Sequence, residues 1–551
     1  MQSKDTSNGP SEFDSWDAST REQFLKRSAA GGLALGASGL LAACGGSSSK
    51  SSTGATGPSG SPAAGGKQTL KQGGNMRIGL EQGGTSDSVD PHTSIGSGDG
   101  ARQFSLYNQL TQTRASVGES KVSYDLAEEI TSNKDATEWT IRLRDGVEFH
   151  NGKTLDVDDL IYTHKRITDP KTASVSFARW ILMDMKAAKK LDKRTLRVPL
   201  VGPNAILPAL VGQTTSAGII PVGFDVKHPI GTGPFKFKSF TPGRQAVFER
   251  FENYYGEKAK VDTLTLVALP DETARYNALL SGQIDILDGV PLAQIDALKA
   301  NSRFVVSSLP SAKWFPIYMR VDRPPFNDVR VRQALRLAVN RQQVVQTAFH
   351  GNAAVGNDVF GRFDPLRDQS LKREQDLEQA KSLLKQAGRE GFRSELVVGP
   401  VGAGAVEMCQ VFAENVKGAG ANISLRQVDL GTMYGPNYGK WPFGVDSWPG
   451  FVYLVQTASW SGAKSPVNLS HQNNPRYASL YSQALAELDE EKRAELIHEL
   501  EKIDFNTGGA VIAAYPNYIA AYTKQVGGFY PANLDGGAVD AGQYNQLGFV
   551  A

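Results

Sequence analysis

The chain has 551 residues, of which 40% are apolar and 21% are charged, and its formal net charge is +2. This composition is ordinary for a folded soluble protein, and the length predicts two or three domains rather than one hydrophobic core. The near-neutral charge argues against nucleic acid as a partner, because proteins that bind nucleic acids carry a strong basic footprint.

The N-terminal segment has the layout of a secretory signal peptide. Lys26 and Arg27 precede an uncharged run from Ser28 to Ala43, and small residues lead up to Cys44. A cysteine at this place resembles a bacterial lipoprotein signal, in which the cysteine is acylated and becomes the new N-terminus. We therefore expect residues 1–43 to be a cleaved signal peptide and Cys44 to be the lipidation site. The rest of the chain would then lie outside the cytoplasm, anchored to the outer face of the cell membrane.

The alternative interpretation of this segment is a transmembrane helix. A membrane span needs about 20 predominantly apolar residues, whereas the run from Ala29 to Ala43 has 15 residues and includes four glycines. The export route stays open between the Sec and twin-arginine pathways. Thr20–Lys26 resembles the twin-arginine motif, but Glu22 stands where its second arginine should be.

A segment dominated by Gly, Ser, Thr, Pro and Ala follows the cysteine, over residues 44–74. Such a composition cannot bury enough apolar surface to fold, so we expect a flexible linker. The folded part is predicted to begin near Asn75, where Met76–Leu80 has the pattern of a first strand.

Strands and helices alternate from there on. Trp139–Arg144 has the alternation of a half-buried strand, and Leu155–Ile167 predicts a helix with Thr154 as its N-cap. The other predicted elements are a strand at Thr263–Val267 and helices at Glu272–Ser281, Val329–Phe349, Leu377–Ala387 and within Tyr477–Asn506. This alternation predicts an α/β protein.

The sequence offers little support for catalysis, a metal site or a cofactor. Gly146–Thr154 has five residues between its glycines, whereas the phosphate-binding loop requires four. The seven histidines are scattered, with no two at the i, i+4 spacing of a helical zinc site. With Cys44 acylated, only Cys409 remains, so no intramolecular disulfide is possible and Cys409 is expected to fill a buried apolar position.

Six stretches run in a fixed order along residues 75–390 and carry a family resemblance. The most specific is Asp125–Glu128 followed by Trp139–Gly152. The others are Asp90–His92 with Leu106–Thr111, Gly231–Phe235, Ala278–Asp285, Pro325–Leu335 and Ala380–Gly388. Together they resemble the family 5 solute-binding proteins of ABC importers, the oligopeptide-, dipeptide- and nickel-binding group.

The resemblance implies a periplasmic-binding-protein-like α/β fold of type II, with two lobes, a hinge cleft and an extra inserted domain. Lobe I would comprise residues 75–114, 218–312 and 514–551, the inserted domain residues 115–217, and lobe III residues 313–513. The chain would cross between the large lobes near Ser308–Met319 and near Ala510–Asn517. Two such crossings form a hinge, and hinge closure around a ligand is how binding proteins of this kind work.

The resemblance assigns only part of the family's ligand site to residues of this chain. Peptide-binding members carry an aspartate shortly after the tryptophan that corresponds to Trp448, and this aspartate pairs with the α-ammonium of the peptide. This chain lacks it, and an enclosed ammonium without a counter-ion is costly, so a free peptide is disfavoured unless Asp446 takes over the role. The aromatic character of the region suits sugars, apolar groups or blocked peptides. The candidate ligand-binding residues are Trp448 and Tyr453 here, Tyr162 in a family helix, and Trp314 and Tyr318 in the first crossing.

The resemblance therefore predicts a lipid-anchored, extracytoplasmic solute-binding subunit of an ABC importer. It would act as a monomer, without a cofactor, metal or catalytic residue, and deliver a peptide-like or aromatic-stacking solute to a membrane permease. The alternative is a stand-alone ligand sensor on the same fold, without a transporter of its own. An extracytoplasmic hydrolase is the third hypothesis.

Overall fold

The computed structural model describes residues 69–93, 97–116, 119–212, 216–462, 465, 467–528 and 543–551. The predicted signal peptide, Cys44 and the predicted linker up to residue 68 lie outside the described residues. In the described ranges, no helix combines the length and the apolar character that crossing a membrane would require.

The largest sheet has seven strands in the order β13-β21-β12-β2-β11-β10-β9. Its central strand, β2, runs parallel to both of its neighbours, β11 and β12, and the remaining pairs are antiparallel. The strands are β2 (Asn75–Leu80), β9 (Phe235–Thr241), β10 (Gln245–Arg250), β11 (Thr263–Ala268), β12 (Ile286–Asp288), β13 (Phe304–Leu309) and β21 (Tyr518–Thr523). Helices α2 (Ser97–Leu106), α6 (Glu272–Leu280) and α7 (Ile295–Ala300) pack on it. We call this part the seven-stranded region.

A small sheet beside it joins distant parts of the sequence, in the order β1-β23-β22. It comprises β1 (Leu70–Lys71), β22 (Val526–Gly527) and β23 (Gly548–Val550). Leu70 and Lys71 fall inside the predicted linker, but here they pair with Val550 and Phe549. Leu70 and Lys71 thus form a strand where the composition predicts a flexible linker.

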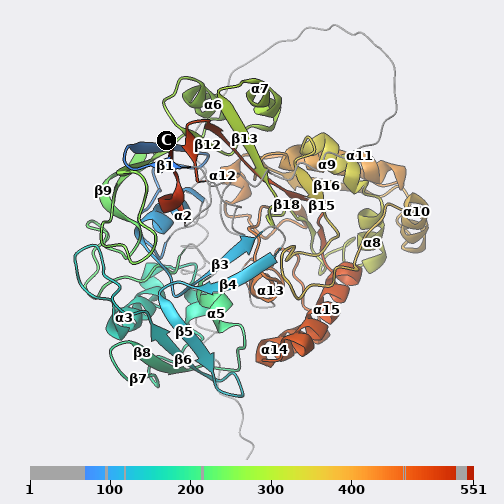
Figure 1. Ribbon diagram of the computed structural model, residues 1–551. Helices are drawn as coiled ribbons and strands as arrows, with labels where there is room; N and C mark the ends of the chain where they lie inside the picture. The colour runs from blue at the N-terminus through green and yellow to red at the C-terminus, as the bar shows by residue number, and fades with distance from the viewer. Residues whose placement is uncertain are drawn as a thin grey trace, which may run out of the picture.

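The second unit, the four-stranded region, is an antiparallel sheet in the order β5-β6-β8-β7, at the lower left of Figure 1. Its elements are β5 (Ala127–Ser132), β6 (Glu138–Leu143), β7 (Lys189–Lys190), β8 (Thr195–Pro199), α3 (Val157–Ile167), α4 (Phe177–Trp180) and α5 (Leu207–Gly212). The hairpin of β3 (Thr111–Ser116) and β4 (Glu119–Tyr124) leads into it. The N-cap of α3 is Asp156 and not the predicted Thr154, because the Asp156 side chain accepts from the backbone N–H groups of Asp158 and Asp159.

The third unit, the five-stranded region, has the sheet order β17-β16-β18-β14-β19. Its strands are β14 (Ile317–Met319), β16 (Arg393–Val398), β17 (Asn422–Gln427), β18 (Phe443–Val445) and β19 (Ala510–Val511). Its helices are α8 (Val329–Leu337), α9 (Arg341–Ala348), α10 (Leu377–Gln386), α11 (Ala405–Gly418), α12 (Leu430–Met433), α13 (Tyr453–Trp460), α14 (Pro475–Ala486) and α15 (Glu490–Thr507). Helices α8 to α11 lie together at the right of Figure 1.

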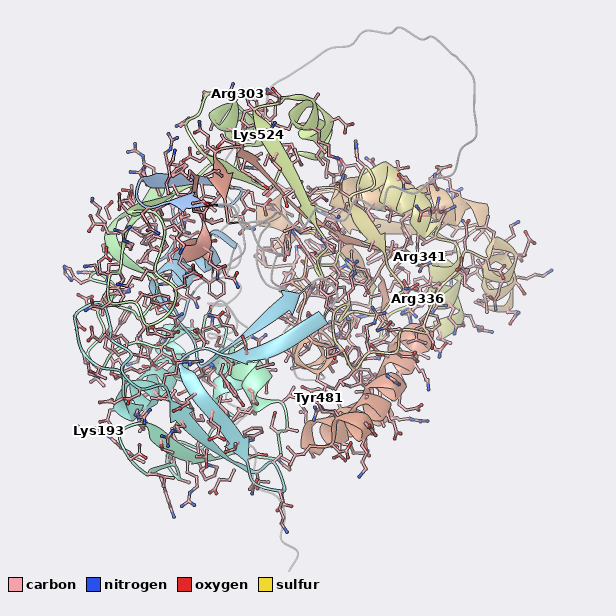
Figure 2. All side chains as sticks on the ribbon, in the orientation of Figure 1. Lys193, Arg303, Arg336, Arg341, Tyr481 and Lys524 are labelled. Atoms are coloured by element: carbon pink, nitrogen blue, oxygen red, sulfur yellow. The ribbon has the colours of Figure 1, made fainter. Side chains whose placement is uncertain are left out.

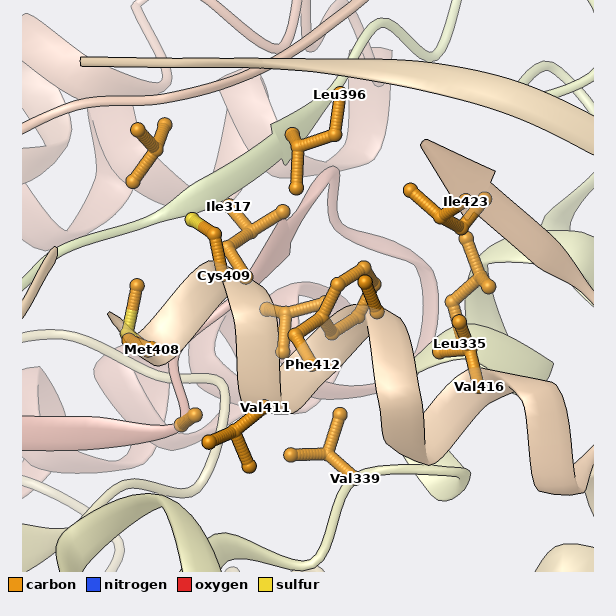
Figure 3. Close-up of a cluster of buried hydrophobic side chains, with 14 of the residues drawn as sticks. Ile317, Leu335, Val339, Leu396, Met408, Cys409, Val411, Phe412, Val416 and Ile423 are labelled. Carbon is orange, nitrogen blue, oxygen red and sulfur yellow. The ribbon is translucent and has the colours of Figure 1, made fainter. Parts of the chain in front are cut away.

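Cys409 lies in the apolar core of this region, where it is fully buried on α11 (Figure 3). Met408, Phe412 and Val416 of the same helix belong to the same cluster. Burial raises the pKa of the Cys409 thiol far above its usual value. The residue is therefore an apolar core residue, as its sequence context predicts.

One predicted helix is divided in the structure, and another segment, predicted to hold at least one helix, holds two. The segment predicted as one helix at Val329–Phe349 forms α8 and α9, because the Asn340 side chain accepts from the backbone N–H of Gln343 and starts a second helix. The segment Tyr477–Asn506 spans α14 and α15, and Asp489 caps the latter in the same way. A capping side chain inside a long polar pattern thus marks a break that periodicity alone misses.

The chain passes between the seven-stranded and five-stranded regions twice. The first crossing connects β13 to β14, and the second connects β19 to β21 through β20 (Ala514–Pro516). The hydroxyl of Ser311 donates to the carbonyl of Pro516 at 2.6 Å, which ties the two crossings together. Strand β15 (Ala353–Val355) pairs with β20 and supports the second crossing.

Buried arginines fasten the beginning of the second crossing. Arg336 of α8 is fully buried and donates to the carbonyls of Phe505 at 3.0 Å, Ala510 at 2.9 Å and Gly508. Arg336 and Arg341 are labelled in Figure 2. Burial lowers the pKa of Arg336 to about 9. The guanidinium therefore holds the carboxyl end of α15, where the partial charge of a helix is negative, against α8 and β19.

Two buried carboxyls lie on α15. Glu501 accepts from the backbone N–H of Asp368 at 2.6 Å, and burial raises its pKa to about 8. Asp504 accepts from the hydroxyls of Tyr453 at 2.6 Å and Tyr477 at 3.0 Å, and burial raises its pKa to about 6. The core beneath α15 is therefore stabilised when Glu501 is protonated.

Candidate functional site

The candidate site lies where the first crossing meets the segment before α13. Trp314 and Trp448 form an isolated antiparallel bridge, with N–H to carbonyl distances of 3.1 Å and 3.0 Å. Gly450 lies so close to Ala312 that a Cβ atom added at Gly450 would come within 2.3 Å of the Ala312 side chain. The segment that follows Trp448 is thus held directly against the crossing.

Three tryptophans come together at this point. The ring centroid of Trp314 is 5.0 Å from that of Trp460 and 6.0 Å from that of Trp448, and Trp448 and Trp460 meet edge to face at 5.4 Å. Phe360 stacks on Trp314 at 5.4 Å and on Tyr453 at 4.7 Å. The rings are almost fully buried and pack on one another as aromatic pairs do.

Asp446 occupies a cage of hydrogen-bond donors beside the tryptophans. Its carboxylate accepts from the hydroxyls of Tyr434 at 3.0 Å and Tyr438 at 2.8 Å. It also accepts from Nε1 of Trp448 at 3.1 Å and from the backbone N–H of Ser447 at 2.8 Å. Burial raises the pKa of Asp446 to about 6, and these hydrogen bonds oppose that rise. The carboxylate therefore holds the indole of Trp448 in place, and all four groups that donate to it belong to the protein itself.

Four of the five predicted ligand-binding residues belong to one buried cluster: Trp314, Tyr318, Trp448 and Tyr453. Tyr318 is 1% exposed and is packed so closely on Gly444 that an added Cβ there would lie 2.5 Å from the Tyr318 hydroxyl. Tyr453 uses its hydroxyl within the core, on Asp504 and Tyr477. Their contact with a solute stays a prediction.

Tyr162 lies elsewhere. It is half-buried on α3 and packs against the core of the seven-stranded region, in the cluster that includes Ile220 and Phe235. The structure does not bring it together with the other four residues. Its role in ligand binding also stays a prediction.

The four-stranded region contacts the segment that follows Trp448. Ala209 and Leu210 of α5 share an apolar cluster with Phe451 and Val455. The guanidinium of Arg179 lies 5.0 Å from the ring centroid of Phe451, and the backbone N–H of Ala205 donates to the carbonyl of Leu485 at 2.6 Å. Burial raises the pKa of Tyr481, which is labelled in Figure 2. The positive charge of Arg179 opposes part of that rise. The two regions are therefore in direct contact around Phe451.

Sequence reasoning missed several side chains of the site. Phe360, Tyr434, Tyr438 and Gln456 are brought in by segments that carry no motif. Trp460 is not among the five predicted ligand-binding residues; it lies four residues after Gln456, on the same face of α13. Among the described residues, no group of three or more His, Cys, Asp or Glu side chains is arranged to hold a metal ion.

The sequence and the fold were compared with known proteins. Residues 121–467 match the model of the family described as bacterial extracellular solute-binding proteins, family 5 Middle. The dipeptide-binding protein of Escherichia coli (strain K12) is 25% identical over 472 residues, which cover 78% of this chain and 87% of that protein. The nickel-binding periplasmic protein of the same organism is 27% identical over 336 residues, covering 56% of this chain and 64% of that protein.

Solved structures of similar proteins share the fold. The ABC transporter substrate-binding protein CtaP from Listeria monocytogenes has a TM-score of 0.77 at 20% identity, with coverage of 87% of this chain and 100% of that chain. The oligopeptide-binding protein AppA from Bacillus subtilis, solved with a nonapeptide, has a TM-score of 0.72 at 19% identity, with coverage of 88% and 100%. These likenesses show that the fold is the two-lobed α/β fold of periplasmic binding proteins.

Proposed function

Because the chain belongs to the family 5 bacterial extracellular solute-binding proteins, we propose that it is the solute-binding subunit of an ABC importer. It captures a small solute between its lobes by hinge closure, and it delivers the solute to a membrane permease. In this proposal lobe I corresponds to the seven-stranded region, the inserted domain to the four-stranded region, and lobe III to the five-stranded region. The protein works as a monomer and carries out no chemical reaction.

The observation that carries the proposal is the pair of adjacent crossings beside the tryptophan cluster. Hinge closure needs a few connecting segments that absorb the motion while the packed units move as bodies. The crossings lie side by side through Ser311 and Pro516, and Trp314 follows Ser311 by three residues. A solute that stacks on the tryptophans would therefore lie at the hinge, where it contacts both moving parts.

The contact at Phe451 provides a test of closure that needs no ligand. Replacing Phe451 with aspartate puts a charge into the apolar contact with Ala209 and Leu210, and an unpaired buried charge is costly. A cost of about 3 kcal/mol would change the ratio of closed to open molecules by roughly 100-fold. We expect Phe451→Asp to increase the radius of gyration in small-angle X-ray scattering.

Val201→Asp is the matched control, because Val201 belongs to the four-stranded region but is 62% exposed. It introduces the same charge without disturbing the contact, so its scattering curve should equal that of the unmodified protein. An unchanged radius of gyration for Phe451→Asp, with the protein still folded, would contradict closure through this contact.

We further propose that Cys44 anchors the protein to the membrane through an acyl chain. Cys44→Ala should move the protein from the membrane fraction to the soluble extracytoplasmic fraction and leave solute affinity unchanged. The control is Cys409→Ala, which removes the other cysteine, buried in the core, and should leave the protein with the membrane. Membrane retention of Cys44→Ala would exclude the lipid anchor.

The solute is proposed to be peptide-like or otherwise able to stack on aromatic rings, and not a peptide with a free α-ammonium. Relatives are named for dipeptides, glutathione, nickel and heme, so the family alone does not select one. Asp446 supports this proposal, because four donors of the protein already occupy its carboxylate. Native mass spectrometry of the purified protein would identify a co-purified solute, and a free peptide in that spectrum would contradict the proposal.

A further inference from the structure

Gln456 is a buried amide whose hydrogen-bonding groups are unused. The residue lies on α13 and is 0% exposed. Neither its amide nitrogen nor its amide oxygen has a hydrogen-bond partner among the residues that the structure describes. Buried side-chain amides are nearly always hydrogen-bonded, so a fully unpaired one has a place for a water molecule or a ligand as its partner.

A second unused donor lies close by in the fold. Nε1 of Trp314 is also buried, and within the described part of the chain nothing accepts its hydrogen bond. Trp314 meets Trp460 edge to face at 5.0 Å, and Trp460 follows Gln456 by four residues, on the same face of α13. Trp460 thus lies on the helical face of Gln456 and in ring contact with Trp314.

Helix α13 belongs to the contact between the four-stranded and five-stranded regions. Val455, directly before Gln456, packs on Ala209 and Leu210. Tyr453 and Leu454 pack instead into the core of the five-stranded region. Separation of the two regions would uncover the face of α13 that carries Val455, the residue next to Gln456.

The charged groups around the site have partners within the protein. Asp446 accepts from four donors, and Asp504 accepts from two tyrosine hydroxyls. Among the described residues, the unused hydrogen-bonding groups of α13, its C-cap and Trp314 are uncharged: the indole N–H of Trp314, the N–H and carbonyl groups of Gln456, and the hydroxyl of Ser461. A side-chain amide pairs with another amide through one donated and one accepted hydrogen bond.

We propose that Gln456 and Nε1 of Trp314 bind an uncharged amide group of the transported solute and thereby determine its specificity. This inference rests on the proposed solute-binding function and names the chemical class of the ligand. The tryptophan rings supply the stacking surface, Gln456 pairs with the amide, and the Trp314 indole donates to its carbonyl oxygen.

The first measurement is the thermal stability of the protein without solute. Leucine resembles glutamine in size and lacks its polar atoms, so Gln456→Leu removes unpaired groups from the interior. We expect its melting temperature to rise by roughly 2 °C or more. Gln103→Leu is the matched control, because Gln103 is also a buried glutamine with both amide atoms unpaired but lies on α2. It should gain similar stability.

The second measurement is calorimetric titration with three probes: N-acetyl-leucyl-leucine amide, free leucyl-leucine and maltotriose. The unmodified protein and Gln103→Leu should bind the blocked peptide with equal affinity. Gln456→Leu, and Gln456→Met as a second variant, should bind it at least tenfold more weakly. Free leucyl-leucine and maltotriose should bind the unmodified protein more weakly than the blocked peptide.

Several outcomes would overturn the inference. A lower melting temperature for Gln456→Leu would show that the amide is used within the protein. Equal affinity of Gln456→Leu and the unmodified protein for the blocked peptide would exclude Gln456 as a specificity residue. Preferential binding of maltotriose or of the free peptide would exclude the amide class and leave the solute-binding function intact. Binding of none of the three probes would also exclude it, while the scattering test of closure judges the function separately.

Discussion

Replacing Arg336 with methionine is expected to lower the free energy of unfolding by about 3–5 kcal/mol. Methionine fills much of the space but donates no hydrogen bond. The carbonyls of Phe505, Gly508 and Ala510 would then lose the guanidinium that they share. Because these carbonyls lie where α15 ends and the second crossing begins, the variant should lose stability mainly at the proposed hinge.

Chemical denaturation followed by circular dichroism measures this effect. Arg330→Met is the control, since Arg330 lies on the same helix but its side chain is 44% exposed and pairs with Asp328 at the surface. Exposed ion pairs contribute about 0–1 kcal/mol. A loss at Arg336 as small as that at Arg330 would show that the three carbonyls find other donors.

The free energy of unfolding is expected to fall as the pH rises from 6.5 to 8, and Glu501 is the cause. The pKa of Glu501 is about 8 in the folded protein and 4.5 in the unfolded chain. The folded state therefore binds the proton more tightly. The stability that this proton contributes is complete below pH 4.5 and is lost as the pH rises through 8. The slope approaches about 1.4 kcal/mol per pH unit, or roughly 2 kcal/mol over this range.

The pH range begins at 6.5 because, at lower pH, other groups make opposing contributions to the free energy of unfolding. His92 and His150 are buried, and burial lowers the pKa of each to about 4, so their contribution to stability grows as the pH rises from 4 to 6.5. Asp446 and Asp504, each with a pKa of about 6, act in the opposite direction over much of that interval. Above pH 6.5 the unfolded histidines are already half deprotonated and both aspartates are largely ionised, so the net change from these four groups is smaller than the change from Glu501.

Thermal unfolding of Glu501→Gln across this pH range isolates the effect. Glutamine keeps the acceptor for the N–H of Asp368 and cannot ionise, so the slope should vanish and the variant should be the more stable protein at pH 8. Glu499→Gln, at an exposed position of the same helix, should retain the slope. Persistence of the slope in Glu501→Gln would assign it to another group.

Local signals in the sequence predict much of the fold. The strand at Trp139–Arg144 and the helix at Leu377–Ala387 appear within a residue or two of their predicted ends, because alternation and a terminal glycine are local properties. The single helix predicted at Val329–Phe349 is wrong, since the Asn340 cap competes with continued helical periodicity. The family resemblance, and with it the two-lobed fold, is confirmed by the match over residues 121–467.

The site could be predicted only where the family supplied it. Trp314 and Trp448 are predicted ligand-binding residues from different parts of the chain, and the structure joins them in one antiparallel bridge. Phe360 and Tyr434 have no local pattern that distinguishes them from other core aromatics, so only the three-dimensional packing reveals them. The unpaired state of Gln456 is likewise a property of its surroundings and not of its sequence.

The second crossing also has a consequence for the order in which the protein can be completed. Strand β19 is the edge of the five-stranded sheet, and β21 lies inside the seven-stranded sheet, where it is the neighbour that joins β13 to β12. Both strands are synthesised after nearly every strand that they join. While a nascent chain lacks residues 510–523, neither large sheet is complete and β13 has no partner. Assembly of both large sheets must therefore wait for late contacts of high sequence separation, which form slowly.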